Sequence, residues 1–287
     1  MVTVGYYTDP YCPWSWGAEP AVRKLMMEFG DSLRWTFVMA GLERDLTGGR
    51  RAATVRLDPV ERDRHLEAWL RAAAESGAPL DPLIWADSPP SSSHPACAAV
   101  KAAAAQADDG GYRYLRALRE GIMCRRRKLD RADALVEVAG EAGLETGRFG
   151  VDLRSHGTTE ELGGDLERSA ALAAKGPKAK FASDAAGAPL PAVIFVGDDE
   201  RDHGVFGLAP YEGYRDAAVA AGARASEAKP LSVEEALARF GSLTTPEVEL
   251  LCELPGPRAN AELFRLAEQW KVRAERVLTG YLWTRPT

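Results

Sequence analysis

The segment TDPYCPWSWG, residues 8–17, joins a short run of β-branched and aromatic residues to a helical pattern. Residues 2–8 (VTVGYYT) predict a buried strand, which the following aspartate–proline pair ends. From residue 13 to 29 the apolar residues recur at helical spacing, and a glycine–aspartate pair closes that helix. Residues 33–40 predict a second strand. Because a strand–helix–strand unit favours a right-handed parallel crossover, this region predicts an α/β fold.

The remainder of the chain extends this pattern. Residues 59–176 contain amphipathic helical stretches and no convincing strand. Strand character returns at 192–196 (AVIFV), followed by a turn, a second short strand at 204–207 and a helix at 210–221. The order strand–helix–strand, insertion, strand–strand–helix is the thioredoxin topology. We therefore predict a thioredoxin-like α/β fold with a large all-helical insertion.

A linker and a separate tail follow. Ser232 and Glu235 have the spacing of a capping box, which predicts a helix start, and further helix starts are expected downstream. We therefore expect a small helical C-terminal extension. The predicted parts are the thioredoxin-like domain (1–58 and 177–224), the helical insertion (59–176) and the extension (231–287).

The composition excludes several classes of protein. The 287 residues carry a net charge of −6, and the tail has seven Lys/Arg against eight Asp/Glu, so no basic surface for nucleic acid is expected. No secretory signal is visible, and no run approaches the roughly 18 apolar residues of a membrane span. The four cysteines form no CxxC pair and no zinc-site spacing. We expect a cytoplasmic protein with no metal and no membrane partner.

Cys12 is the main candidate for chemistry. It lies at the end of a predicted strand and in the first turn of a predicted helix, where free N–H groups favour an anion and can lower a thiol pKa. The hydroxyl of Ser15, one turn later, can donate a hydrogen bond to the same thiolate. The alternative is that Cys12 is a small buried side chain, as many lone cysteines are.

The segment TDPYCPWSWGAEP resembles the active-site segment of DsbA-type thioredoxin-fold proteins, particularly their FrnE-like branch. SSSHPACAAVKAA and YLRALREGIMCRRRKLD resemble helices of that branch's insertion, and LPAVIF resembles the segment with its cis-proline. The resemblance implies that Pro191, after Leu190, adopts the cis form and contacts the substrate backbone, with Pro189 as a rival. Pro13 and Trp14 beside Cys12 would help to shape a substrate groove, although Trp14 can equally cap the surface.

The tail carries a looser resemblance. Residues 231–287, ending in GYLW, are similar in layout to the tail of the ClpXP adaptor that delivers the Spx regulator, which is also DsbA-like. This implies a protein client or a protease as partner. It is an alternative to partners that are thiols or disulfides.

The sequence departs from the family at one position that decides the mechanism. A dithiol oxidase needs a second cysteine to resolve its mixed disulfide, and Ser15 cannot do this. We therefore expect a thiol–disulfide oxidoreductase that acts through Cys12 alone, with no tightly bound cofactor and with glutathione, mycothiol or bacillithiol as resolving thiol. The alternatives are a non-catalytic adaptor and a glutathione-dependent isomerase or transferase.

Two further residues are weighed against structural roles. Cys97, near a predicted helix start, is a candidate second thiol, but a buried place on an alanine-rich helix face is favoured. His94 can orient a substrate, but a turn or capping role is favoured because the sequence has only four histidines and no constellation of Cys, His and Asp near this one.

Overall fold

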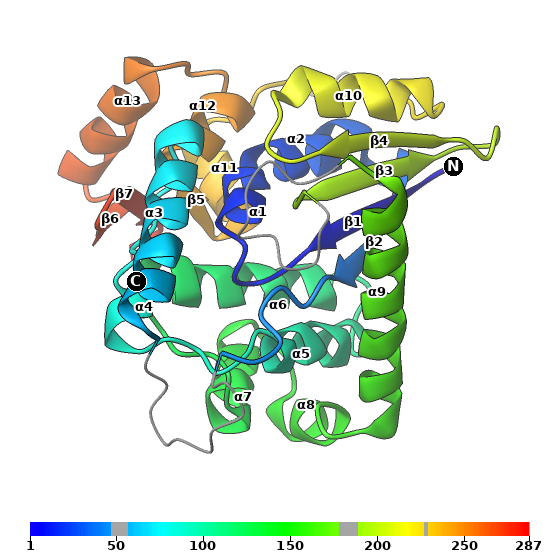
Figure 1. Ribbon diagram of the computed structural model, residues 1–287. Helices are drawn as coiled ribbons and strands as arrows, with labels where there is room; N and C mark the ends of the chain where they lie inside the picture. Colours follow the sequence, from blue (N-terminus) through cyan, green and yellow to red (C-terminus); the bar gives the residue numbers. More distant parts are fainter. Residues whose placement is uncertain (47–56, 178–188, 227–228, 287) are drawn as a thin grey trace.

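The computed structural model describes residues 1–46, 57–177, 189–226 and 229–286 (Figure 1). Part of the predicted second half of the thioredoxin-like domain and part of the linker lie outside the described residues. The central sheet has four strands in the order β2-β1-β3-β4. They are β1 (Val2–Thr8), β2 (Leu33–Met39), β3 (Ala192–Val196) and β4 (Asp202–Phe206).

The strand pairing confirms the predicted topology. β1 is parallel to β2, with Val2 opposite Leu33, which requires the crossover expected from the first forty residues. β3 is antiparallel to both β1 and β4. Strands far apart in the sequence therefore lie side by side, and the ends of β1 and β2 and the start of β3 meet at one edge of the sheet.

Helices α1 (Pro13–Gly17) and α2 (Glu19–Phe29), a short 3-10 turn η1 (Gly30–Ser32) and α10 (Tyr211–Ala220) complete this domain. α2 and α10 cover one face of the sheet, where residues such as Val4, Phe195 and Tyr214 form a core. The sequence predicted one helix from 13 to 29, but it breaks at Ala18. Pro20 causes this, because proline has no N–H to donate and its ring clashes with the preceding turn.

The insertion predicted at 59–176 contains helices joined by loops, and none of its residues forms a strand in the structure. α3 packs against α1, and α9 runs along β2 (Figure 1). Its core is continuous with Tyr11 and Trp16 of the sheet domain. The elements are α3 (Pro59–Ser76), α4 (Ile84–Asp87), α5 (His94–Ala104), α6 (Gly110–Arg119), the π-helical turn η2 (Glu120–Cys124), α7 (Ala132–Glu141), α8 (Thr146–Asp152) and α9 (His156–Lys175).

The C-terminal extension contains the expected helices but also an unexpected sheet. The capping box of Ser232 and Glu235 is present at the start of the first helix. GYLWT, expected to belong to a helical tail, is instead the central strand of an antiparallel sheet of order β5-β7-β6. The elements are α11 (Val233–Phe240), β5 (Ser242–Thr244), α12 (Thr245–Leu251), α13 (Pro257–Glu268), β6 (Arg273–Val277) and β7 (Gly280–Thr284).

The missed strands have a physical explanation. β5 is only three residues long and pairs with a strand some forty residues later, so it has no local periodicity to detect. Met27 of α2 joins the core of the extension, which ties this part to the sheet domain. Within the described ranges, no helix is long and apolar enough to cross a bilayer.

Candidate functional site

Cys12 lies where the sequence placed it, at the strand–helix junction. It is the N-cap residue of α1, with extended backbone angles (φ −80°, ψ 111°), and Pro13 follows at the first helical position. The Cys12 Sγ accepts a hydrogen bond from the backbone N–H of Ser15 at 3.4 Å. An N-cap side chain that accepts from a free helical N–H is suited to carry negative charge.

The structure gives the Ser15 hydroxyl no hydrogen bond to Cys12, so its role at the thiolate stays a prediction. The Ser15 Oγ is buried and has no hydrogen-bond partner among the described residues. The backbone N–H of Ser15 takes its place at the sulfur. The reason is geometric, because the N-cap side chain faces the backbone N–H groups two and three positions later.

Cys12 is buried, and much of its cover consists of apolar side chains. It has no exposed surface, and it packs in one cluster with Trp14, Leu42, Ala72 and Leu190. These residues come from the site helix, the chain after β2, helix α3 and the segment before β3. The sulfur is therefore inaccessible to a second molecule in this conformation.

The segment before β3 has the conformation that the resemblance implied. The Leu190–Pro191 peptide bond is cis, and both residues are buried. The Pro191 carbonyl accepts a hydrogen bond from the N–H of Gly207 at the end of β4. The structure thus brings the Leu190 side chain to Cys12, but neither Pro191 nor Trp14 forms an open groove. Their substrate-binding role stays a prediction.

Asp9 organises the loops around Cys12. Its buried carboxylate accepts hydrogen bonds from the backbone N–H groups of Tyr11 and Leu42, both at 2.8 Å. It also accepts from the Ser93 hydroxyl at 2.8 Å and from the Cys97 thiol at 3.3 Å. One side chain therefore links the site loop, the chain after β2 and the start of α5.

A buried arginine supplies positive charge close to Cys12. Arg119, at the end of α6, is fully buried and donates hydrogen bonds to the Glu19 carboxylate and the Thr8 hydroxyl. Burial alone would lower its pKa, but the Tyr6 hydroxyl, Glu19 and Cys12 together raise the pKa of the Arg119 guanidinium overall. By symmetry of the interaction, Arg119 favours the thiolate form of Cys12.

The same charged layer joins all three parts of the protein. Glu247 of α12 is fully buried and accepts two hydrogen bonds from Arg116 of α6, at 2.9 and 3.0 Å. Arg23 of α2 lies 3.0 Å from the same carboxylate. Burial would raise the pKa of Glu247, but Arg116 and Arg23 hold it below its usual value. The extension is therefore attached through a paired buried charge.

His65 and Glu43 also lie beside Cys12, and sequence reasoning missed both. They line a small cavity of about 20 Å³ together with Cys12 and Trp85. The His65 ring stacks on Trp85 at 3.9 Å, and its Nε2 lies 3.9 Å from a Glu43 oxygen. Burial lowers the pKa of His65 to about 4 and raises the pKa of Glu43 to about 7. His65 lies in the amphipathic pattern of α3, more than fifty residues from Cys12 in the sequence. Its neighbouring residues therefore gave no indication that it would lie near Cys12.

The other three cysteines behave as structural residues. Cys97 is fully buried, and burial together with the adjacent Asp9 carboxylate raises the pKa of its thiol. Burial likewise raises the pKa of Cys124, and it raises that of Cys252 to about 11. All four cysteines are free thiols. Cys97 thus has the buried position favoured from sequence, as a donor to Asp9.

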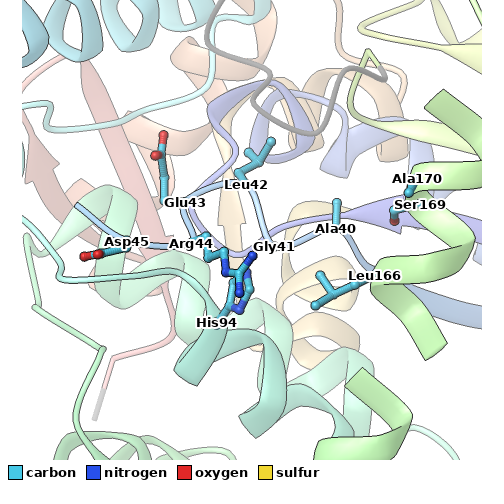
Figure 2. A pocket seen from close by; sticks show the side chains of 10 residues that line it. All are labelled: Ala40, Gly41, Leu42, Glu43, Arg44, Asp45, His94, Leu166, Ser169 and Ala170. Atoms are coloured by element: carbon cyan, nitrogen blue, oxygen red, sulfur yellow. The ribbon is translucent and has the colours of Figure 1, made fainter. Parts of the chain in front are cut away.

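His94 lies outside the Cys12 cluster. It lines a larger cavity of about 670 Å³. Figure 2 shows its ring near Gly41 and Arg44, with Leu166 and Ser169 of α9 on another side of the cavity. Gly41 has a φ of 61°, and a Cβ there would lie 2.7 Å from the His94 Nε2. Leu42 lines both this cavity and the Cys12 cluster. The structure therefore does not bring His94 into the set of residues that line Cys12, and its substrate-binding role stays a prediction.

Comparison with known proteins agrees with this architecture. The ClpXP adapter protein SpxH of Halalkalibacterium halodurans is 27% identical over 282 residues, which cover 96% of this chain and 86% of that protein. A candidate protein disulfide isomerase from Nitrosomonas europaea superposes with a TM-score of 0.61 at 18% identity, covering 77% of this chain and 97% of its own. A DsbA oxidoreductase candidate from Streptomyces coelicolor superposes with a TM-score of 0.54 at 19% identity, and the match covers 81% of this chain and 94% of that one.

The family assignment rests on a match to a sequence model of a protein family. The sequence model described as thioredoxin matches residues 6–212, which include the Cys12 segment, the whole insertion and the Leu190–Pro191 bond. The fold and layout are those suspected from the sequence, a DsbA-like thioredoxin fold with an SpxH-like tail. The chain belongs to the thioredoxin family.

Proposed function

We propose that this chain is a cytoplasmic client-binding adapter of the SpxH type, which presents a protein partner to a ClpXP protease. The observation that carries the proposal is the complete burial of Cys12, the only cysteine in the site motif. The similarity to the SpxH adapter also extends through the C-terminal extension, because it covers 96% of the chain. Both features favour binding over turnover.

Burial opposes catalysis for a direct reason. Thiol–disulfide exchange requires the thiolate to reach a disulfide sulfur of the substrate. The cavity beside Cys12, about 20 Å³, has room for little more than one water molecule. The isomerase or transferase alternative, which needs an apolar substrate cavity beside Cys12, gains no support from so small a space.

Single-cysteine exchange is the second candidate, because the surroundings of Cys12 suit a thiolate. The Ser15 N–H and the Arg119 charge both favour the anion. In that mechanism the Cys12 thiolate attacks a disulfide, releases one thiolate and forms a mixed disulfide. Glutathione, mycothiol or bacillithiol then attacks the mixed disulfide and supplies the electrons that regenerate Cys12. Helix α3, which carries Ala72, would have to move to admit the substrate.

One pair of measurements separates the two candidates. The chain is added to purified ClpXP with Spx as client, and the rate of Spx loss is followed with wild type and with Cys12→Ser. An adapter increases the rate in both forms. Native alkylation of Cys12 is followed over pH by intact mass, and the high pKa of the other thiols keeps the background low. No effect on Spx, together with rapid alkylation near neutral pH, would reverse the order of the candidates.

A further inference from the structure

A groove of about 530 Å³ lies where the three parts of the protein meet. Figure 1 shows the end of α3 beside α12, with the chain from β4 into α10 close to both. At the closest approach of α1 and α3, a Cβ on Gly17 would lie 2.6 Å from the Ser76 Cβ. On the other side, Pro246 of α12 reaches Gly77, so the extension forms one wall. The groove therefore exists only when the extension is docked.

The groove is acidic and has no opposing charge. Glu75, Glu212 and Glu249 line it, and no lysine, arginine or histidine does so among the residues that the structure describes. None of the three glutamates forms an ion pair within the described part of the chain. Lys24 of α2 pairs with Glu253 instead. The groove therefore carries negative charge that no lining residue offsets.

Two of these glutamates occupy unfavourable helical positions. Glu75 is in the last turn of α3 and Glu249 is in the last turn of α12, where unpaired carbonyl groups already produce negative potential. A carboxylate in a last turn weakens the helix, because its negative charge adds to that of the free carbonyl groups. Burial also raises the pKa of Glu249, with no cation to offset it. A cationic partner would relieve all of these costs.

The remaining lining is apolar. Leu208, Leu250 and several prolines form the walls between the carboxylates. Leu208 also packs against the Cys12 cluster, so the groove begins next to the thioredoxin site. A ligand that matches both features needs positive charges together with bulky apolar groups, which the side chains of a polypeptide supply and the short unbranched spacers of a polyamine do not.

We propose that this groove, formed by α1–α2, the end of α3, the β4–α10 connection and α12, binds an extended basic segment of a protein partner. Lysine or arginine side chains contact Glu75, Glu212 and Glu249, and apolar side chains contact Leu208 and Leu250. The inference rests on the proposed adapter function, for which it names the chemistry of the client segment. It also gives the C-terminal extension a direct role in recognition.

The binding test uses fluorescence anisotropy with the full chain. The probe is the fluorescein-labelled peptide KLAKPLAKLA, and the comparison peptide has every lysine replaced by glutamate. The triple variant Glu75→Gln, Glu212→Gln, Glu249→Gln should weaken lysine-peptide binding tenfold or more. A matched triple variant on the exposed face of α9 removes the same charge and should change affinity less than twofold. It is Glu160→Gln, Glu161→Gln, Glu167→Gln.

Several outcomes would overturn the proposal. They are equal binding by the two triple variants, equal binding of the glutamate peptide, and displacement of the probe by spermidine at the same concentration as by unlabelled peptide. Unchanged thermal unfolding of the groove variant shows that its loss of binding is local. Weaker binding with rising salt is expected, because the contacts lie at the surface.

The Spx degradation assay separates this inference from the proposed function. If wild type stimulates ClpXP and the groove variant does so equally, the groove is not the client site and the adapter function stands. If wild type has no effect on ClpXP but binds the lysine peptide through the three glutamates, the groove stands and the adapter function falls.

Discussion

Removing the charge of Glu247 should weaken the attachment of the C-terminal extension. This carboxylate is completely buried and contacts Arg116 and Arg23, which belong to the insertion and to the sheet domain. It also forms the capping box of α12 with Thr244. Glu247→Gln removes the charge and keeps a side chain that can serve the cap. Glu247→Ala removes both.

The expected loss of stability depends on the other partners that Arg116 and Arg23 retain. Breaking one side of a buried ion pair costs about 3–5 kcal/mol, because the other charge is left buried without its partner. Arg116 keeps Glu120 at 2.8 Å, and Arg23 keeps the Ser242 carbonyl at 2.7 Å, so the lower end of this range applies. We expect Glu247→Gln to lower the free energy of unfolding by about 3 kcal/mol. Glu247→Ala should cost about 1 kcal/mol more through the lost cap.

Urea unfolding monitored by tryptophan fluorescence measures these changes. The control is Glu253→Gln, which removes the ion pair between the exposed Glu253 of the extension and Lys24 of α2. Ion pairs with an exposed partner contribute about 0–1 kcal/mol, so this control should change the free energy of unfolding very little. A Glu247→Gln cost as small as that of the control would refute the reasoning.

The acid dependence gives a second check on the same residue. The folded state lowers the pKa of Glu247 below its ordinary value of 4.5. Its contribution to stability is therefore full above that pH and is lost as the pH falls through the lower, folded-state pKa. The difference between wild type and Glu247→Gln should shrink below about pH 4.5. A difference that is constant down to pH 3 would contradict the assignment.

Three further predictions concern the surroundings of Cys12. Asp9→Asn should lower the free energy of unfolding by about 3 kcal/mol, because an amide NH₂ would face donors now served by a carboxylate oxygen; a loss below about 1 kcal/mol in urea unfolding would contradict this. Gly17→Ala should cost about 1–3 kcal/mol by overpacking against Ser76. The double variant with Ser76→Gly should recover most of that loss, and additive effects would count against the contact. Glu43→Gln should stabilise the protein by up to about 3 kcal/mol at pH 8 but by little at pH 4.5. Burial raises the pKa of Glu43 to about 7, so the folded state opposes its ionisation at the higher pH. Urea titrations at the two pH values decide this, and an equal effect at both would be against it.

Much of the fold was predictable because its signals are local. The β-branched run before Asp9, the helical spacing after Pro13 and the AVIFV strand each follow from neighbouring residues. Cys12 was correctly placed at a helix start for the same reason. The break at Ala18 was also present locally, in Pro20, but a continuous apolar pattern concealed it.

The tertiary structure alone decided the state of the site. No local pattern indicates that Ala72 of α3 packs in the same cluster as Cys12, or that His65 and Glu43 lie beside Cys12. The sheet of the extension escaped detection because β5 pairs with a strand forty residues away. The sequence by itself determined the thioredoxin topology and the single cysteine at its helix start. The burial of Cys12, the shifted pKa values of His65 and Glu43, and the acidic groove all depend on which distant segments pack together. That packing is a property of the whole fold.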